Sequence, residues 1–136
     1  MINPIDTFFY GLYMDDEVLA GMGVTPRSPR KASAAGFALR IGTRATLVRK
    51  RGGTVWGVVY ALAPEELARL YGGAGLEAYQ PEDIEVALEN RAIIPARVYN
   101  LPLPPPPDER NPEYVEKLKA VLTRLRFPPD YIAGIQ

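Results

Sequence analysis

An eight-residue apolar segment in the middle of the chain constrains the fold more than any other feature. It reads Val55-Trp56-Gly57-Val58-Val59-Tyr60-Ala61-Leu62. Its β-branched and aromatic residues are typical of a strand, and the absence of polar alternation predicts burial on both faces. Arg51-Gly52-Gly53-Thr54 precedes it, and Gly-Gly supplies the positive φ values that a two-residue hairpin loop requires. The sequence therefore predicts a hairpin turn over 51–54, between a strand over 45–50 and this central strand.

Four other segments have the composition or the pattern of strands. Residues 84–89 alternate apolar side chains with glutamate and alanine, which is typical of a half-buried strand. Asn90-Arg91 then forms a turn into a strand over 92–99. Residues 7–10 and 32–41 complete the set. The Gly- and Pro-rich residues 20–29 are expected to form an irregular connection.

Two further segments carry the signals of helices. Pro64 suits the first position of a helix, and the two glutamates that follow it favour the positive end of the helix dipole. Gly72-Gly73 is expected to end this helix. Asn111 caps a second helix that begins with Pro112, near the C-terminus. Their buried faces are expected to carry Leu67, Leu70, Tyr71, Val115, Leu118, Val121, Leu122 and Leu125.

These elements predict an α+β fold in a single domain over residues 1–136. Five or six short strands would form a small, mixed, barrel-like sheet with helices flanking it. The proline run over 101–107 cannot join the interior of a sheet, and we expect it to cross the surface as a stiff connector. Recognition of this run by a partner domain is the alternative.

The composition excludes several kinds of chemistry. The chain of 136 residues has no Cys and no His, which removes thiol nucleophiles, disulfides, histidine bases and the usual zinc sites. Proton transfer would fall to Glu, Asp, Tyr or Lys. No apolar run approaches the length that spans a membrane, and the N-terminus lacks the features of a signal peptide. We therefore expect a cytoplasmic protein without a membrane partner.

The net charge of zero hides an uneven distribution of charged residues. No acidic residue occurs over 18–64, a segment that contains eight Lys and Arg side chains. One interpretation is a positively charged face for anionic ligands or nucleic acid. The other is solvated strand edges and turns. Phe37 is the one aromatic residue among these charges and no nucleic-acid motif accompanies them, so the second interpretation is favoured and no nucleic-acid partner is expected.

A candidate ligand site lies at Tyr10-Gly11-Leu12-Tyr13-Met14, directly after the first expected strand. Gly11 allows a tight turn and a close approach of the backbone to a ligand. If a helix follows at once from Asp15, its free N–H groups point at the same place and favour an anion such as a carboxylate. The alternative is a tight turn with no ligand.

The order of these segments resembles the gamma-glutamylcyclotransferase-like (AIG2-like) family. The resemblance rests on the strand ending in Tyr10-Gly11, the Val55–Tyr60 strand with the helix behind it, and the tail Phe127-Pro128-Pro129-Asp130-Tyr131-Ile132. It implies a small mixed barrel-like sheet with flanking helices. It also implies that the α-amine of a γ-glutamyl amine, peptide or amino acid attacks its own γ-carbonyl, releasing 5-oxoproline. No metal or organic cofactor is implied.

The resemblance also assigns roles to individual residues. The backbone of Tyr10, Gly11, Leu12, Tyr13 and Met14 would hold the α-carboxylate of a γ-glutamyl ligand, and Tyr13 stands where the family usually has Asn. The tyrosines that line the family's pocket correspond to Tyr79 and Tyr114. The family's acid/base glutamate corresponds to Ala74, which cannot transfer a proton, and a family aspartate corresponds to Tyr71.

Two functional hypotheses follow from the alanine at position 74. The first is an active cyclotransferase in which Glu77, three residues further on, acts as a relocated acid/base; otherwise Glu77 is a solvated loop residue. The second is a non-catalytic module that binds a γ-glutamyl-like or other small anionic ligand. A carboxylate pointing into the pocket beside Tyr10–Met14 would favour the first hypothesis.

Overall fold

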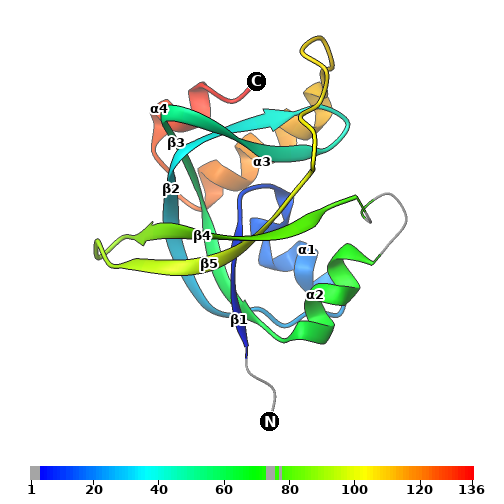
Figure 1. Ribbon diagram of the computed structural model, residues 1–136, viewed down its shortest axis with the longest axis vertical. Helices are drawn as coiled ribbons and strands as arrows, with labels where there is room; N and C mark the ends of the chain where they lie inside the picture. The colour runs from blue at the N-terminus through cyan, green and yellow to red at the C-terminus, as the bar shows by residue number, and fades with distance from the viewer. Residues whose placement is uncertain (1–3, 73–75, 77) are drawn as a thin grey trace.

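The computed structural model describes residues 4–72, 76 and 78–136, and these contain five strands that form a closed barrel. Around the barrel the strands follow the order β1-β3-β2-β4-β5 (Figure 1). The strands are β1 (Ile5–Phe9), β2 (Arg27–Ile41), β3 (Ala45–Leu62), β4 (Gln80–Leu88) and β5 (Ile93–Asn100). Neighbouring strands are antiparallel except β1 and β5, which are parallel and meet where Thr7 is paired with Arg97. The expected α+β fold with a mixed, barrel-like sheet is confirmed.

The helices lie outside the barrel in two groups, as Figure 1 shows. A 3-10 turn, η1 (Leu12–Met14), leads into α1 (Asp16–Gly21), and α2 (Pro64–Tyr71) lies beside α1. The C-terminal helices α3 (Pro112–Arg124) and α4 (Pro129–Ala133) form the other group. None of the helices in the described ranges is long and apolar enough to cross a membrane.

The helix signals in the sequence are confirmed. Pro64 is the first residue of α2 and Pro112 is the first residue of α3. The Asn111 side chain caps α3 by accepting the N–H of Tyr114 at 3.1 Å. After α3 the chain forms the short helix α4, where the sequence predicted only a packed tail. Residues 101–107 lie outside every strand and helix, as expected for the proline run.

The predicted hairpin turn over 51–54 is wrong, because β3 continues through it. The N-terminal half of β3 pairs with the C-terminal half of β2, with Arg49 opposite Phe37. The C-terminal half of β3 pairs with the N-terminal half of β2, with Thr54 opposite Ala35. The chain therefore reverses over 42–44, while residues 50–53 form an irregularity opposite a single β2 residue. An irregularity of this kind can use a positive φ just as a hairpin loop does, and Gly52 has φ 80°.

The prediction that residues 20–29 contain no regular element is wrong in part. The strand β2 begins at Arg27, paired with Ala61, and its register shifts before Arg30 pairs with Val59. Proline is tolerated at such an irregularity because it has no N–H to donate to the neighbouring strand. Pro29 lies inside this shift, so the strand accommodates it without losing its pairing further along.

The C-terminal half of β3 is central to the core, as predicted. Every residue over 55–62 is buried except Trp56, which is half-buried. The indole ring packs against Phe127 from the segment between α3 and α4, with ring centroids 6.3 Å apart. A fully buried Trp56 was expected, but its side chain is only half-buried. Removal of the indole would therefore cost less than the loss of a core aromatic residue.

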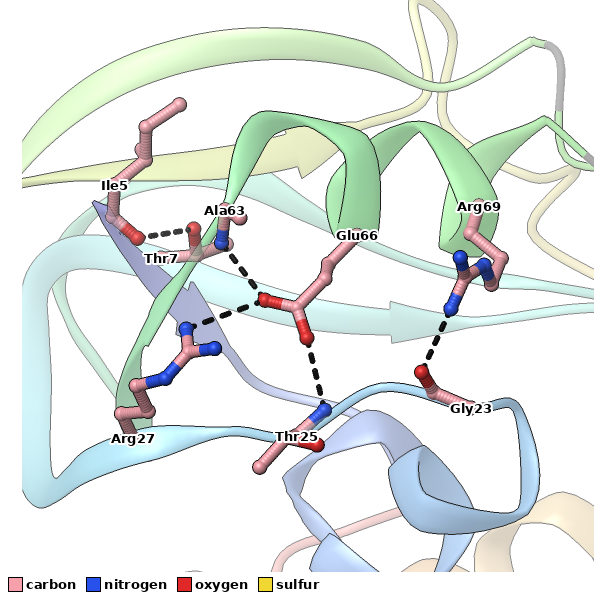
Figure 2. A network of polar contacts seen from close by, with 8 residues as sticks. All are labelled: Ile5, Thr7, Gly23, Thr25, Arg27, Ala63, Glu66 and Arg69. Carbon is pink, nitrogen blue, oxygen red and sulfur yellow. Dashed lines mark hydrogen bonds and ion pairs between the residues drawn. The ribbon is translucent and has the colours of Figure 1, made fainter. Parts of the chain in front are cut away.

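A buried carboxylate, Glu66, joins α2 to the segment that precedes β2 (Figure 2). Its Oε1 accepts the N–H of Ala63 and its Oε2 accepts the N–H of Thr25, both at 2.9 Å. The Arg27 guanidinium lies 3.4 Å from Oε1. Burial by itself raises the pKa of Glu66, but the two N–H donors and Arg27 outweigh it and hold the pKa below its ordinary value.

We expect Glu66→Gln to lower the free energy of unfolding by about 1–3 kcal/mol at pH 7, because it removes a charged acceptor from two buried donors. The pKa of Glu66 is lower in the folded state, so its contribution is present above the unfolded-state pKa. The contribution is lost as the pH falls through the folded-state pKa. Denaturant melts of the two proteins should therefore differ at pH 7, and the difference should shrink at about pH 3. Glu65→Gln, on the exposed face of α2, is the control, and an equal loss there would contradict the assignment.

Candidate functional site

A cavity of about 280 Å³ opens where η1, the β2–β3 turn and the first turn of α3 meet the end of α2. Six residues that the sequence analysis singled out line it: Tyr10, Gly11, Leu12, Tyr13, Tyr79 and Tyr114. Met14 does not, because its side chain is fully buried and its carbonyl accepts the hydroxyl of Tyr60 at 2.8 Å. The other lining residues are Phe8, Phe9, Val18, Thr43, Arg44, Ala45, Tyr71 and Leu76.

The loop after β1 contacts the first turn of α3 through a hydrogen bond to Tyr114. The backbone N–H of Leu12 donates to the hydroxyl of Tyr114 at 3.2 Å. A Cβ atom on residue 11 would overlap this hydroxyl oxygen, so glycine at position 11 permits the contact. The close approach expected at Gly11 is thus made to a tyrosine of the protein itself.

A helix follows from Asp15, as the sequence analysis considered, because α1 begins at Asp16 with Asp15 as its N-cap. The η1 turn lies between Gly11 and α1, and the Asp15 side chain caps α1 by accepting the N–H of Glu17 at 2.9 Å. Aspartate is a strong capping residue and here takes a donor that an anionic ligand would otherwise use. Asp15 also pairs with Arg124 of α3 at 2.8 Å. The start of α1 is therefore tied to the fold, and two residues of η1, Leu12 and Tyr13, line the cavity.

Three of the cavity tyrosines donate their hydroxyl protons to backbone carbonyls. Tyr10 donates to Tyr99 at 2.8 Å, Tyr13 donates to Leu70 at 3.1 Å, and Tyr79 donates to Ala45. Burial raises the pKa of all three. A phenol with a raised pKa stays protonated near neutral pH, so these side chains act as neutral walls and not as bases.

Stacked and edge-on rings make one wall of the cavity rigid. Tyr71 stacks on Tyr99 with ring centroids 4.0 Å apart and 17° between the ring planes. Tyr13 and Tyr79 each lie 5.7 Å from Tyr71 in tilted or edge-on geometry. Such aromatic pairs fix one another, and they give the cavity an apolar face suited to a ring or an aliphatic chain.

The sequence analysis missed Arg44, which lines the cavity from the end of the β2–β3 turn. The strands on either side of this turn were predicted, but nothing in the sequence separates Arg44 from the seven other basic residues over 18–64. The analysis also missed the role of Asn111 beyond its capping of α3. The Asn111 amide nitrogen donates to the carbonyl of Gly42 at 3.1 Å and thereby fixes this turn to the start of α3.

Two predicted positions, Ala74 and Glu77, lie outside the described residues. Among the described lining residues there is no aspartate or glutamate. Over the same described part of the chain, no group of three or more Asp or Glu side chains could hold a metal ion. The described lining therefore offers tyrosine hydroxyls, a guanidinium and backbone groups to a ligand.

Comparisons with known proteins identify the fold and the family model that the chain matches. A model of the family described as gamma-glutamyl cyclotransferase, AIG2-like, matches residues 7–118. No curated protein sequence matches the chain. A solved structure described as gamma-glutamyl cyclotransferase has a TM-score of 0.80 at 21% identity, covering 98% of this chain and 88% of that chain.

Two further solved structures share the fold. An uncharacterized protein from Homo sapiens has a TM-score of 0.80 at 21% identity, with 98% of this chain and 89% of that chain covered. The Bacillus subtilis protein YkqA has a TM-score of 0.77 at 21% identity, with 98% of this chain but only 55% of that chain covered. The whole described barrel therefore has counterparts in solved structures.

Proposed function

This chain belongs to the gamma-glutamyl cyclotransferase, AIG2-like family, and on that basis we propose that it binds γ-glutamyl-type ligands in the aromatic cavity with little or no cyclotransferase activity. The observation that carries the proposal is the chemistry of the described lining, which combines tyrosines and Arg44 without a carboxylate. Such a lining can hold an anionic ligand and shape its surroundings, but it supplies no group that exchanges protons near neutral pH.

The reaction of the family needs two proton transfers. The ligand's α-ammonium must lose a proton before its nitrogen attacks the γ-carbonyl carbon, and the departing amine must gain one as the amide bond breaks. A general acid/base at this point contributes about 10²–10⁴-fold in rate. The family's glutamate corresponds by resemblance to Ala74, and alanine can do neither. Binding without turnover is the consequence.

The second candidate is an active cyclotransferase that uses Glu77. This residue follows Ala74 closely in the sequence, and a carboxylate on a neighbouring position could replace the missing acid/base if it reached the same atoms. Placement decides the outcome, because an error of about 1 Å can cost about a hundredfold in rate. The two candidates bind the same ligands and differ in turnover, so an assay of the product separates them.

Nucleic-acid binding is not part of the proposal. Several basic residues of the 18–64 segment are paired within the protein. Arg30 lies 2.7 Å from Asp6 and Arg49 lies 3.3 Å from Glu82. The ammonium of Lys31 lies over the ring of Phe127, 5.3 Å from its centroid. These contacts support the interpretation of this segment as solvated strand edges.

Calorimetry and a product assay on the purified protein test the proposal. With γ-glutamylalanine and γ-glutamylphenylalanine we expect saturable binding, and 5-oxoproline formation below about 0.1 s⁻¹, a hundredfold under a typical enzyme turnover number. Turnover at ordinary enzyme rates would contradict the non-catalytic proposal. If Glu77→Gln then abolished that turnover while Glu85→Gln, on an exposed position of β4, did not, Glu77 would be the acid/base.

A further inference from the structure

Arg44 brings a positive charge to a cavity whose described lining is otherwise uncharged. The side chain is half-buried and comes from the end of the β2–β3 turn, whereas the η1 backbone belongs to the connection between β1 and α1. Burial raises the pKa of Tyr79, and the charge of Arg44 opposes this rise, so the guanidinium lies within electrostatic reach of the aromatic wall. A guanidinium at a partly desolvated apolar wall is a strong partner for a carboxylate.

The backbone before Arg44 is held by hydrogen bonds from residues that do not belong to the β2–β3 turn. The Asn111 side chain donates to the carbonyl of Gly42 and accepts the N–H of Tyr114, each at 3.1 Å. The N–H of Thr43 donates to the carboxylate of Glu109. One asparagine therefore connects the turn that carries Arg44 to the helical turn that carries Tyr114. Asn111 thus links the backbone next to Arg44 to the backbone of Tyr114.

Tyr114 differs from the cavity tyrosines that donate to carbonyls. Its hydroxyl oxygen accepts the N–H of Leu12, which leaves the hydroxyl proton free to point toward a ligand. The bond also holds this hydroxyl beside Leu12, in the Tyr10–Met14 loop where the family resemblance places the α-carboxylate of a γ-glutamyl group. The cavity thus has two places where an anionic group of a ligand could bind. One lies at Tyr114 and η1, and the other lies at Arg44 on the β2–β3 turn.

We propose that Arg44 is a specificity-determining residue that pairs with the carboxylate of the leaving amino acid, so that the cavity prefers γ-glutamyl amino acids with aromatic side chains over γ-glutamyl amines. This inference rests on the proposed function and on the family resemblance, which places the α-carboxylate at the backbone of Tyr10–Met14. The second carboxylate then meets the one cation in the described lining, and the side chain of the leaving amino acid lies on the wall formed by Tyr13, Tyr71 and Tyr79. A γ-glutamyl amine has no second carboxylate and leaves Arg44 unpaired.

Calorimetry with two matched pairs of ligands tests this assignment. The first pair is γ-glutamylphenylalanine and γ-glutamylphenethylamine, which differ only in the carboxylate of the leaving group. The second pair is 3-phenylpropionate and 3-phenylpropionamide, which contain no glutamyl group. We expect the wild-type protein to bind the carboxylate of each pair at least about tenfold more tightly. Arg44→Gln should reduce both ratios to near one.

Two further variants act as controls in the same experiment. Arg44→Lys keeps the charge but loses the planar fork, so it should retain part of the preference. Arg51→Gln makes the same change in net charge at an exposed position of β3 and should leave both ratios unchanged. Circular dichroism establishes that each variant is folded before the titrations.

The outcomes separate this inference from the proposed function. An absent preference in the wild-type protein, or an equal loss of affinity for both members of a pair in Arg44→Gln, overturns the role of Arg44 even if γ-glutamyl compounds bind. Arg44-dependent binding of 3-phenylpropionate without binding of any γ-glutamyl compound overturns the proposed function and leaves Arg44 as a carboxylate-binding residue. A failure of all four compounds to bind overturns both.

Discussion

Ala74→Glu is expected to raise the rate of 5-oxoproline formation from γ-glutamyl dipeptides by about 10²–10⁴-fold. The variant restores a carboxylate at the position that corresponds to the family's acid/base. That group takes a proton from the attacking amine and passes it to the departing one, and the rest of the binding site is unchanged. The measurement is 5-oxoproline released per unit time at saturating ligand, for the wild-type and variant proteins side by side.

Ala74→Gln is the matched control for this gain. Glutamine has nearly the shape of glutamate but cannot exchange a proton, so its rate should stay at that of the wild-type protein. An increase for Gln as large as that for Glu would point to a change in shape and not to acid/base catalysis. No increase for Glu, in a variant that still binds ligand with unchanged affinity, would mean that position 74 is not the acid/base position in this chain.

Gly57→Ala is expected to lower the free energy of unfolding by about 3 kcal/mol, at the upper end of the range for overpacking. A Cβ atom on residue 57 would overlap the carbonyl oxygen of Phe9 and would lie 2.8 Å from the ring of Phe8. Both neighbours belong to β1, which pairs with this part of β3. A backbone oxygen cannot turn aside as a side chain can, so β1 would have to move away from β3. Urea melts measure the loss.

Gly21→Ala, at the last residue of α1, provides the comparison. Nothing lies within 4 Å of a Cβ added there, so this variant should be neutral or slightly stabilising. Because β1 leads directly into Tyr10 and Gly11, Gly57→Ala should also weaken ligand binding, while Gly21→Ala should not. A stability of Gly57→Ala within about 0.5 kcal/mol of the wild-type value would contradict the tight approach of β1.

The parts of the fold with local chemical signals could be predicted from the sequence. The starts of α2 and α3 depend on residues next to each other in the chain, Pro64 before two glutamates and Asn111 before Pro112, and the predictions were correct. The prediction of a hairpin turn at Gly52 and Gly53 failed because a positive φ occurs in a bulge as well as in a turn. The choice between these depends on β2, which continues to pair with β3 on both sides of the bulge.

The residues of the candidate site also fall into those that the sequence could predict and those that it could not. The resemblance pointed to Tyr10, Gly11, Tyr79 and Tyr114, and the fold brings these residues to one cavity. Arg44 could not be found, because its position depends on hydrogen bonds from Asn111, far along the chain. The partial exposure of Trp56 could not be predicted either, because an apolar strand of a barrel still has an outer face. Local sequence patterns predict where helices and strands lie. Which side chains become neighbours is decided by the closure of the barrel, which depends on distant parts of the chain.

That closure sets an order of events in folding. The parallel contact that completes the barrel joins Thr7 to Arg97, and the hydroxyl of Tyr10 reaches Asn100, 90 residues further along the chain. Contacts between such distant residues carry a large loop-closure entropy and form slowly. The cavity wall at Tyr10 can therefore be completed only after β5 has been synthesised and has joined β1. Binding competence is consequently a property of the whole barrel, because it requires both β1 and β5 to be in place.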